Sequence, residues 1–403
     1  MSRILLAWEL GTGFGHLGPF LGLAPKLLER GHELHIAARE IAGACRAVAG
    51  LPITVHQAPL CLNTYSGLQD PPLNFAEILM RYGYLDPPML RAMVIAWRSL
   101  LRVTGAKLVI ADHAPTALIA ARLSGIATAV VGTPFSVPPD VHPSPNMRPW
   151  VDVPAARLAD SDARVLAVIN AALPAGAAPV TEISRIFSGA GRLFAGVPEL
   201  DPYLPRDPGD YLGMHTLSTG SAAPSWPTGN GPRVFCYFHA DYRHIERALQ
   251  AVAECGARVL VYVNGLPAPL AQRFTGAGLQ FASTLLDMRR LVEECDLCVC
   301  HGNIGTALSM LGGGRPLLVL PKHLEQFLLG RALEQIGAGR VVLADDEAPD
   351  IAGSLRAMLA DAAFAGKARA FAERYRGESV GTMTERAVAR IEELASQGAG
   401  HSP

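Results

Sequence analysis

The chain has 403 residues, of which 50% are hydrophobic and only 18% are charged. A chain of this length and composition can bury the cores of two or three domains and is not intrinsically disordered. Its 35 lysines and arginines nearly balance its 36 aspartates and glutamates. This balance argues against a nucleic-acid-binding surface, which normally needs a basic excess.

Membrane and export signals are not expected. The sequence contains no apolar run close to the ~20 residues that a membrane span requires. The first residues, MSRILLAWELGTG, are interpreted as a strand and a turn, because they lack the longer apolar region and cleavage site of a signal peptide. The seven cysteines show no framework spacing, which is typical of reduced thiols. We therefore expect a cytoplasmic protein.

Compact apolar stretches alternate with helical patterns in the first part of the chain. An apolar periodicity of helical spacing runs from Leu17 to Leu28, and Gly31 follows as a helix stop. This alternation of strands and helices predicts a parallel sheet with helices on both faces. The predicted strands are Arg3–Trp8, Leu34–Ala38, Ile53–His56, Leu108–Ala111 and Ile126–Val131.

Residues 133–150 contain six prolines, which excludes regular structure there, and two helices are expected after them, up to about Ser188. The stretch 197–232 is rich in Pro, Gly, Ser and Thr and is the best candidate for a linker. Strands and helices then alternate again. The predicted strands are Val234–Phe238, Val259–Val263, Leu279–Phe281, Leu297–Cys300, Leu317–Leu320 and Val341–Leu343.

We therefore predict an α/β protein with two Rossmann-like, doubly wound domains that face a cleft. The expected division is residues 1–200 for the first domain, 201–232 for the linker and 233–379 for the second domain. A helix and tail, residues 380–403, follow, and the helix is expected to pack back on the first domain. Ligands of such sheets bind beyond the carboxyl ends of the strands.

A glycine-rich turn, Gly11-Thr12-Gly13-Phe14-Gly15-His16, follows the first strand. It does not match the dinucleotide-binding spacing G-x-G-x-x-G, because His16 takes the third glycine's place, so a nicotinamide site is disfavoured. His16 is either a polar residue at a helix start or a catalytic one. Asp112 follows another strand and either caps a helix or pairs with His16. The ends of parallel strands converge, and a histidine base needs such a partner to fix its tautomer.

Two further segments contain residues suited to bind a ligand. A strand ends at His301 and a helix begins in the small residues after it, which suits a phosphate. Zinc is the alternative there, because Cys295, Cys298 and Cys300 lie nearby, but buried cysteines are favoured. The adjacent Glu325 and Gln326 stand at another helix start. They either hold sugar hydroxyls or form a solvated helix start.

These segments together resemble the nucleotide-sugar glycosyltransferases that modify macrolides, flavonoids and other natural products. The motifs are GFGHLGP with GHEL, VIADHAP, VPELDPY before YLG, and HGNIGTALSML…GGGRPLLVLPKHLEQ…GAG. The resemblance covers most of the chain in the family's order. It implies the GT-B fold and an inverting, metal-independent sugar transfer with no cofactor besides the nucleotide-sugar co-substrate.

The resemblance also implies roles for individual residues. His16 matches the catalytic base and Asp112 its orienting partner. The implied donor-binding residues are His301, Gly302, Asn303, Gly305, Thr306, Ser309, Glu325 and Gln326. The family often has glutamate, a ligand of ribose hydroxyls, at the position of Ser309, and a Gly-Ser turn where this chain has Phe238-His239-Ala240-Asp241. These departures leave both UDP and dTDP open as the donor nucleotide. They also leave open the alternative that the protein is a catalytically silent, donor-binding helper. A nucleotide-sugar epimerase is disfavoured.

The acceptor is expected to be a small, largely apolar molecule. Residues 60–100 are rich in aromatic residues and methionine, which at helical spacing usually belong to a core. In the family this region lines the acceptor pocket, so both interpretations stay open. The residues are Tyr65, Phe75, Met80, Tyr82, Tyr84, Met89, Met93 and Trp97.

Overall fold

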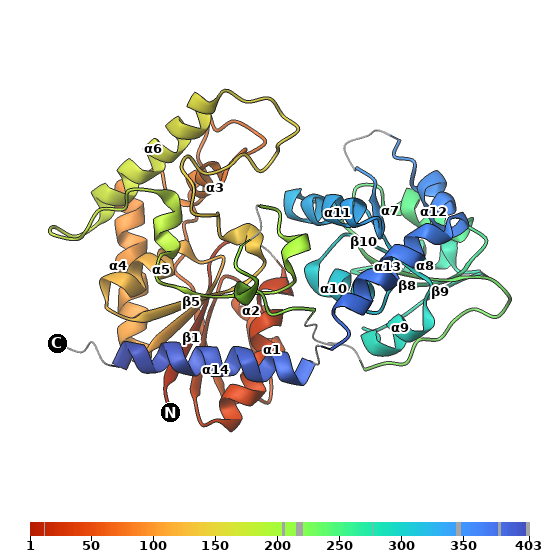
Figure 1. Cartoon of the computed structure of the whole chain (residues 1–403), viewed down its shortest axis with the longest axis horizontal. Helices are drawn as coiled ribbons and strands as arrows, with labels where there is room; N and C mark the ends of the chain where they lie inside the picture. The colour runs from red at the N-terminus through yellow and green to blue at the C-terminus, as the bar shows by residue number, and fades with distance from the viewer. Residues whose placement is uncertain are drawn as a thin grey trace. The chain divides into compact units, whose positions relative to one another are not determined.

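The computed structural model describes residues 1–403 except 12, 204–205, 215–220, 277, 344–347, 378–379 and 400–403. The chain forms two compact units (Figure 1). Unit 1 comprises Met1–Ala195, Tyr203–Leu212 and Gly381–Pro403, and unit 2 comprises Gly196–Pro202 and Gly213–Val380.

Unit 1 contains a six-stranded sheet in the order β3-β2-β1-β4-β5-β6, and all its strands are parallel. The five strands predicted in this part of the chain are confirmed within one residue at each end, and β6 was not predicted. The register aligns Trp8 with Asp112, so the turn after β1 and the end of β4 lie at the same edge. The strands are β1 (Arg3–Trp8), β2 (Glu33–Ala38), β3 (Ile53–Gln57), β4 (Leu108–Asp112), β5 (Ala127–Gly132) and β6 (Gly191–Phe194).

Helices cover both faces of this sheet because successive strand side chains point to opposite sides. Leu6 and Trp8 of β1 join one core, and Leu5 and Ala7 join the other. Helices α1 (Gly18–Glu29), α2 (Ile41–Ala47) and α14 (Val380–Ala399) contribute to the first core, and α14 lies along unit 1 in Figure 1. The second core is completed by α3 (Phe75–Leu79), α4 (Pro87–Thr104), α5 (Pro115–Leu123) and α6 (Ala155–Ala172).

Unit 2 repeats this plan with the strand order β12-β11-β10-β7-β8-β9, again all parallel. Counted along the chain within each unit, both sheets have the order 3-2-1-4-5-6 of a doubly wound fold. The first five predicted strands are confirmed within one residue at each end, whereas β12 begins and ends two residues earlier than expected and shares only Val341 with the prediction. The strands are β7 (Arg233–His239), β8 (Arg258–Asn264), β9 (Leu279–Phe281), β10 (Leu297–Cys300), β11 (Leu317–Val319) and β12 (Gly339–Val341).

The helices of unit 2 also cover both faces of its sheet. One core includes α7 (Ile245–Ala253) and α12 (Ile351–Ala360), with α8 (Ala268–Phe274) packed against it. The other includes α9 (Met288–Glu294), α10 (Ile304–Gly312), α11 (Leu324–Ile336) and α13 (Ala362–Arg374).

The cysteines near His301 lie in the second of these cores, as predicted for small buried hydrophobic residues. They are Cys295, Cys298 and Cys300. Burial raises the pKa of the Cys295 thiol to about 12. Among the residues that the structure describes, no group of three or more His, Cys, Asp or Glu side chains is placed to hold a metal ion.

The expected linker, residues 201–232, is divided between the two units. Tyr211 and Leu212 are buried in the cores of unit 1. Trp226 packs on unit 2, where its Nε1–H donates to Glu294 Oε2 at 2.7 Å. Apolar burial therefore attaches most of this segment to one unit or the other, and residues 204–205 and 215–220 lie outside the described residues.

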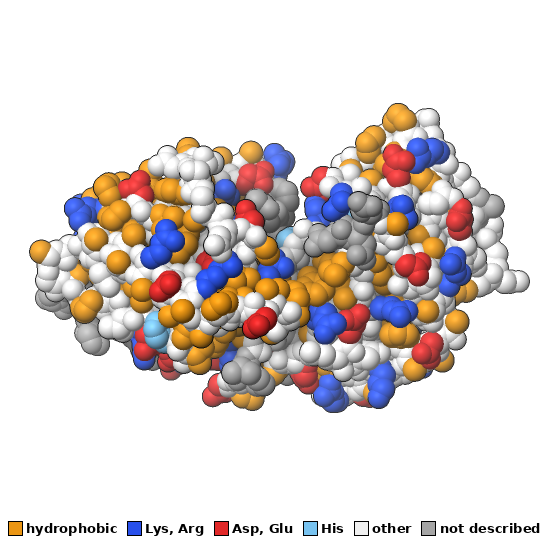
Figure 2. All heavy atoms as spheres, turned by 90° about the horizontal axis from the view of Figure 1, so that it is seen from above, with side chains coloured by type: hydrophobic (Ala, Val, Ile, Leu, Met, Phe, Trp, Pro, Cys, Tyr) orange, Lys and Arg blue, Asp and Glu red, His pale blue; other side chains and the backbone are white. Residues whose placement is uncertain are grey.

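The surface shows mixed charge. Acidic and basic side chains are interspersed on the face drawn in Figure 2. Within the described ranges, the structure contains no helix that is both long enough and apolar enough to cross a membrane.

Candidate active site

The structure brings His16 and Asp112 together at the carboxyl edge of the sheet of unit 1. His16 ends a short 3-10 helix after β1, and Asp112 ends β4. His16 Nδ1 lies 3.0 Å from Asp112 Oδ1, and 18% of the His16 side chain is exposed against 4% for Asp112. Burial raises the pKa of Asp112, and the interaction with His16 opposes that rise. The pair is thus a buried carboxyl group in hydrogen-bond contact with a partly accessible imidazole.

Two glycines make room for this pair. Gly11 has φ +78°, and a Cβ there would collide with Nε2 of His16. Gly132, at the end of the adjacent strand β5, has φ +92°, and a Cβ there would lie 2.6 Å from Asp112 Oδ2. Trp8 stacks on the His16 ring, with the centroids 5.3 Å apart. Sequence reasoning noted Gly11 but missed Gly132, for which the signal was a glycine ending the strand beside β4.

His113, directly after Asp112, was also missed. Its backbone has φ +47°, which is uncommon for a residue with a side chain. Its ring lies 6.1 Å from that of His16, and its Nε2 is buried with no hydrogen-bond partner in the described part of the chain. Burial lowers the pKa of His113 to about 3, so this imidazole is neutral at physiological pH.

A buried carboxyl group lies at the same edge. Glu9 follows β1 and is fully buried, and its Oε2 accepts the backbone N–H of Thr116 at 3.0 Å. The Thr116 hydroxyl lies 2.5 Å from Glu9 Oε1 and 2.8 Å from the Tyr84 hydroxyl. Burial raises the pKa of Glu9 to about 7, against the opposing hydrogen bonds from Thr116. The edge that carries His16 and Asp112 therefore also contains a carboxyl group whose pKa lies near neutrality.

The aromatic segment 60–100 belongs largely to the core. Phe75, Tyr84 and Trp97 are fully buried, and Met80 and Met93 nearly so. The core interpretation is thus confirmed for these five residues. Tyr65, Tyr82 and Met89 are partly exposed.

At the corresponding edge of unit 2, His301 is buried, with 1% exposed. Its Nδ1 lies 2.7 Å from the carbonyl oxygen of Leu320, so Nδ1 carries the hydrogen. Its Nε2 accepts the backbone N–H of His239 at 3.0 Å. Burial is the main reason that the pKa of His301 falls to about 4, which keeps the ring neutral. A hydrogen bond from Nε2 to a phosphate would need the other tautomer or a second proton.

Gln326 connects two turns at this edge. Its Nε2 donates to Asn303 Oδ1 at 2.7 Å, and its Oε1 accepts the backbone N–H of Lys322 at 2.8 Å. Asn303 precedes α10 and makes no side-chain cap to it. Gly302 has φ +90°, and a Cβ there would lie 2.8 Å from Val319. Gln326 therefore fixes the turn after β11 relative to the start of α10.

Of the other predicted donor residues, Gly305 and Thr306 lie on the first turn of α10, Ser309 on its second turn and Glu325 on the first turn of α11. Gly305 is exposed and Thr306 is buried. Ser309 donates its hydroxyl to the carbonyl oxygen of Gly305 at 2.9 Å. Glu325, in the first turn of α11, is half-buried. The structure thus joins Asn303 and Gln326 by a direct hydrogen bond, whereas His301 bonds to the backbone of Leu320 and His239.

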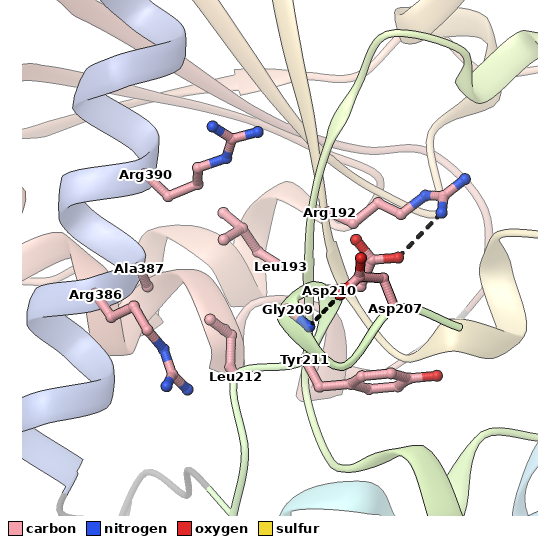
Figure 3. Close-up of a pocket in the computed structure, with 10 residues that line it drawn as sticks. All are labelled: Arg192, Leu193, Asp207, Gly209, Asp210, Tyr211, Leu212, Arg386, Ala387 and Arg390. Carbon is pink, nitrogen blue, oxygen red and sulfur yellow. Dashed lines mark hydrogen bonds and ion pairs between the residues drawn. The ribbon is translucent and has the colours of Figure 1, made fainter. Parts of the chain in front are cut away.

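A cavity of about 310 Å³ lies elsewhere in unit 1 (Figure 3). Arg386 and Arg390 project from α14 toward it, and Arg192 of β6 pairs with Asp210 at 3.0 Å. The cavity is lined by charges of both signs and by none of the predicted site residues.

Solved structures share the fold of this chain. The chain has the GT-B fold of nucleotide-sugar glycosyltransferases, and the resemblance seen in the sequence is confirmed at the level of fold. It is similar to glycosyltransferase VinC in complex with dTDP, at 19% identity over 98% of this chain and 100% of that chain, with TM-score 0.67. It is also similar to the spinosyn rhamnosyltransferase SpnG complexed with thymidine diphosphate, at 20% identity over 97% and 100% of the chains, with TM-score 0.63.

A curated relative is similar over part of the sequence. The PGL/p-HBAD biosynthesis glycosyltransferase of Mycobacterium tuberculosis (strain ATCC 25177 / H37Ra) is 28% identical over 202 residues. The match covers 48% of this chain and 46% of the relative, so the chain spans just under half of the relative's length. No family model matches the chain.

Proposed function

We propose that this protein is a glycosyltransferase that moves a sugar from a nucleoside diphosphate to a hydroxyl of a small, largely apolar acceptor. The observation that carries the proposal is the contact of 3.0 Å between His16 and Asp112 at the edge of a doubly wound sheet. The fold that the chain shares with sugar-transferring enzymes supports it.

The dyad suits general base catalysis. Asp112 accepts the Nδ1–H of His16, so Nε2 is the ring nitrogen that takes the proton of the acceptor hydroxyl. The acceptor oxygen forms its bond to the anomeric carbon while the bond from that carbon to the diphosphate oxygen breaks, and the electron pair leaves with the nucleotide. This single displacement inverts the anomeric carbon. The Asp112 carboxylate stabilises the imidazolium that results.

The same proposal places the leaving diphosphate at the start of α10, without a metal ion. The backbone N–H groups of a helix start and the helix dipole favour an anion. Asn303 leaves that start without a side-chain cap. We favour thymidine over uridine donors, because Ser309 stands where a carboxylate would serve ribose hydroxyls and because VinC and SpnG are described with bound thymidine diphosphate.

A product assay tests the proposal. The protein is incubated with a panel of UDP- and dTDP-sugars, with and without hydroxyl-bearing aromatic or macrocyclic acceptors, and nucleoside diphosphate is measured. Release that requires acceptor supports the transferase. Isomerised donor without release would indicate an epimerase, and donor that binds but stays unchanged would indicate a helper protein. Either result would overturn the proposal.

A further inference from the structure

An ion pair at the donor edge of unit 2 has no role in the reaction described above. The ammonium group of Lys322 pairs with the carboxylate of Asp241. Lys322 follows β11 and Asp241 follows β7, and β10 lies between these two strands in the sheet. The ion pair therefore joins the turns on either side of the strand that leads, through His301, into α10.

Hydrogen bonds hold both turns in place. The backbone N–H of Lys322 donates to Gln326, whose side-chain amide donates to Asn303 before α10. On the other side, the backbone N–H of His239 donates to the buried ring of His301. Both backbone segments are thus tied to the start of α10, and the ion pair joins their side chains.

The positive charge near the start of α10 comes from Lys322 rather than from His239 or His301. Burial keeps His301 neutral, with its pKa at about 4, and burial also lowers the pKa of His239. The positive charge of Lys322 contributes to lowering both pKa values, so its field reaches both rings. A nucleoside diphosphate brings two charged phosphates to this edge. A nearby ammonium group would stabilise them more than a neutral imidazole.

We propose that Lys322 is the cation that binds the diphosphate of the donor, and that Asp241 occupies Lys322 while the donor is absent. The inference deepens the proposed function and rests on its assignment of the donor to unit 2. Lys322 lowers the pKa of Asp241 mainly through their hydrogen bond, so the carboxylate is charged and acts as an internal anion. The Asp241 side chain is 74% exposed, so it can leave Lys322 for water when the diphosphate enters.

The turn sequence supports this interpretation. Where the resembling family has a Gly-Ser turn after the first strand of this domain, the present chain has Phe238-His239-Ala240-Asp241. That replacement supplies the carboxylate that pairs with Lys322. The alternative is an ordinary surface ion pair, which contributes little to stability and nothing to binding.

Calorimetric titration of the full chain with thymidine diphosphate and with uncharged thymidine tests the proposal. Lys322→Met should weaken thymidine diphosphate binding by about tenfold, and Lys322→Arg should restore most of the loss. Asp241→Asn should tighten binding by about threefold, because the competing anion is gone. Thymidine affinity should not change in any of these variants. Lys367→Met, an exposed lysine on α13, is the matched control and should bind like wild type.

Three outcomes separate the possible failures. If wild type binds no nucleoside diphosphate, the donor assignment itself is wrong. If wild type binds but Lys322→Met binds equally well, the proposed function stands and Lys322 is only a surface ion-pair partner. The double variant Asp241→Asn/Lys322→Met provides the third outcome. If Asp241→Asn tightens binding as much in the Lys322→Met background as in wild type, simple repulsion by Asp241 explains the gain, and competition for Lys322 is wrong.

Discussion

The two units place a histidine at the same edge of the same kind of sheet, but they give it opposite surroundings. His16 contacts a buried carboxylate and keeps 18% of its side chain exposed. His301 is nearly fully buried, and both its ring nitrogens bond to backbone groups. A carboxylate partner stabilises a protonated imidazole, whereas burial among neutral groups disfavours it. His16 is therefore suited to accept a proton, and His301 to hold a turn in place as a neutral ring.

The largest expected effect comes from removing the base. His16→Ala should lower turnover by roughly 10²- to 10⁴-fold, the range for loss of a general base, and leave thymidine diphosphate binding unchanged. Steady-state rates and calorimetry on the same preparation measure the two quantities.

Asp112→Asn should lower turnover less, because the amide still holds the ring but no longer stabilises its charge. Wild-type rates in both variants with a hydroxyl acceptor would show that the dyad is not catalytic.

Opposite pH dependences of stability would sharpen the contrast between the two edges. Burial raises the pKa of Glu9 from 4.5 to about 7, so its contribution to the unfolding free energy is present below pH 4.5 and lost as pH rises through 7. Between pH 4.5 and 8, the unfolding free energy of wild type should therefore fall by about 3 kcal/mol more than that of Glu9→Gln.

His301 should act in the other direction. Its pKa falls from 6.5 to about 4, so its stabilising contribution is present above pH 6.5 and lost as pH falls toward 4. Urea unfolding of wild type, Glu9→Gln and His301→Gln across this range measures both. Equal pH profiles for wild type and Glu9→Gln would mean that Glu9 titrates at its ordinary pKa.

A methyl group at Gly132 should disturb the dyad without removing either member. Gly132→Ala places a Cβ against the Asp112 carboxylate, so turnover should fall by about ten- to a hundredfold through misorientation of His16. Gly125→Ala is the matched control. That glycine also has positive φ, at +64°, but nothing lies within 4 Å of its added Cβ. Gly125→Ala should cost stability and leave turnover intact, and an equal loss of turnover in both variants would point to general backbone strain.

Much of the fold could be predicted from the sequence, because buried parallel strands appear as short apolar runs between helical patterns. The pairing of His16 with Asp112 followed from topology, since β1 and β4 are neighbours and end at one edge. Strand β6 escaped prediction because its sequence, Gly191-Arg192-Leu193-Phe194, is not a continuous apolar run.

The missing parts of the candidate site depend on tertiary contacts that no local pattern contains. The fit of Gly132 against Asp112 arises from two strands that are separate in sequence. The tautomer of His301 is set by the carbonyl of Leu320 and the amide of His239, which reach it from two other strands. The pairing of Lys322 with Asp241 likewise needs the order of three strands.

The smallest expected effect concerns which nucleotide the edge near His301 prefers. The Ser309 hydroxyl is neutral, and it donates within its own helix to the carbonyl oxygen of Gly305. It therefore offers no carboxylate to the ribose. We expect wild type to bind thymidine diphosphate at least as tightly as uridine diphosphate. Ser309→Glu should shift the ratio toward uridine diphosphate by about fivefold, the net value of one added hydrogen bond to the 2′-hydroxyl. Ser309→Gln, which has the same length without the charge, should shift it less. A tenfold preference of wild type for uridine diphosphate would contradict the deoxyribose assignment while leaving sugar transfer by the His16–Asp112 dyad intact.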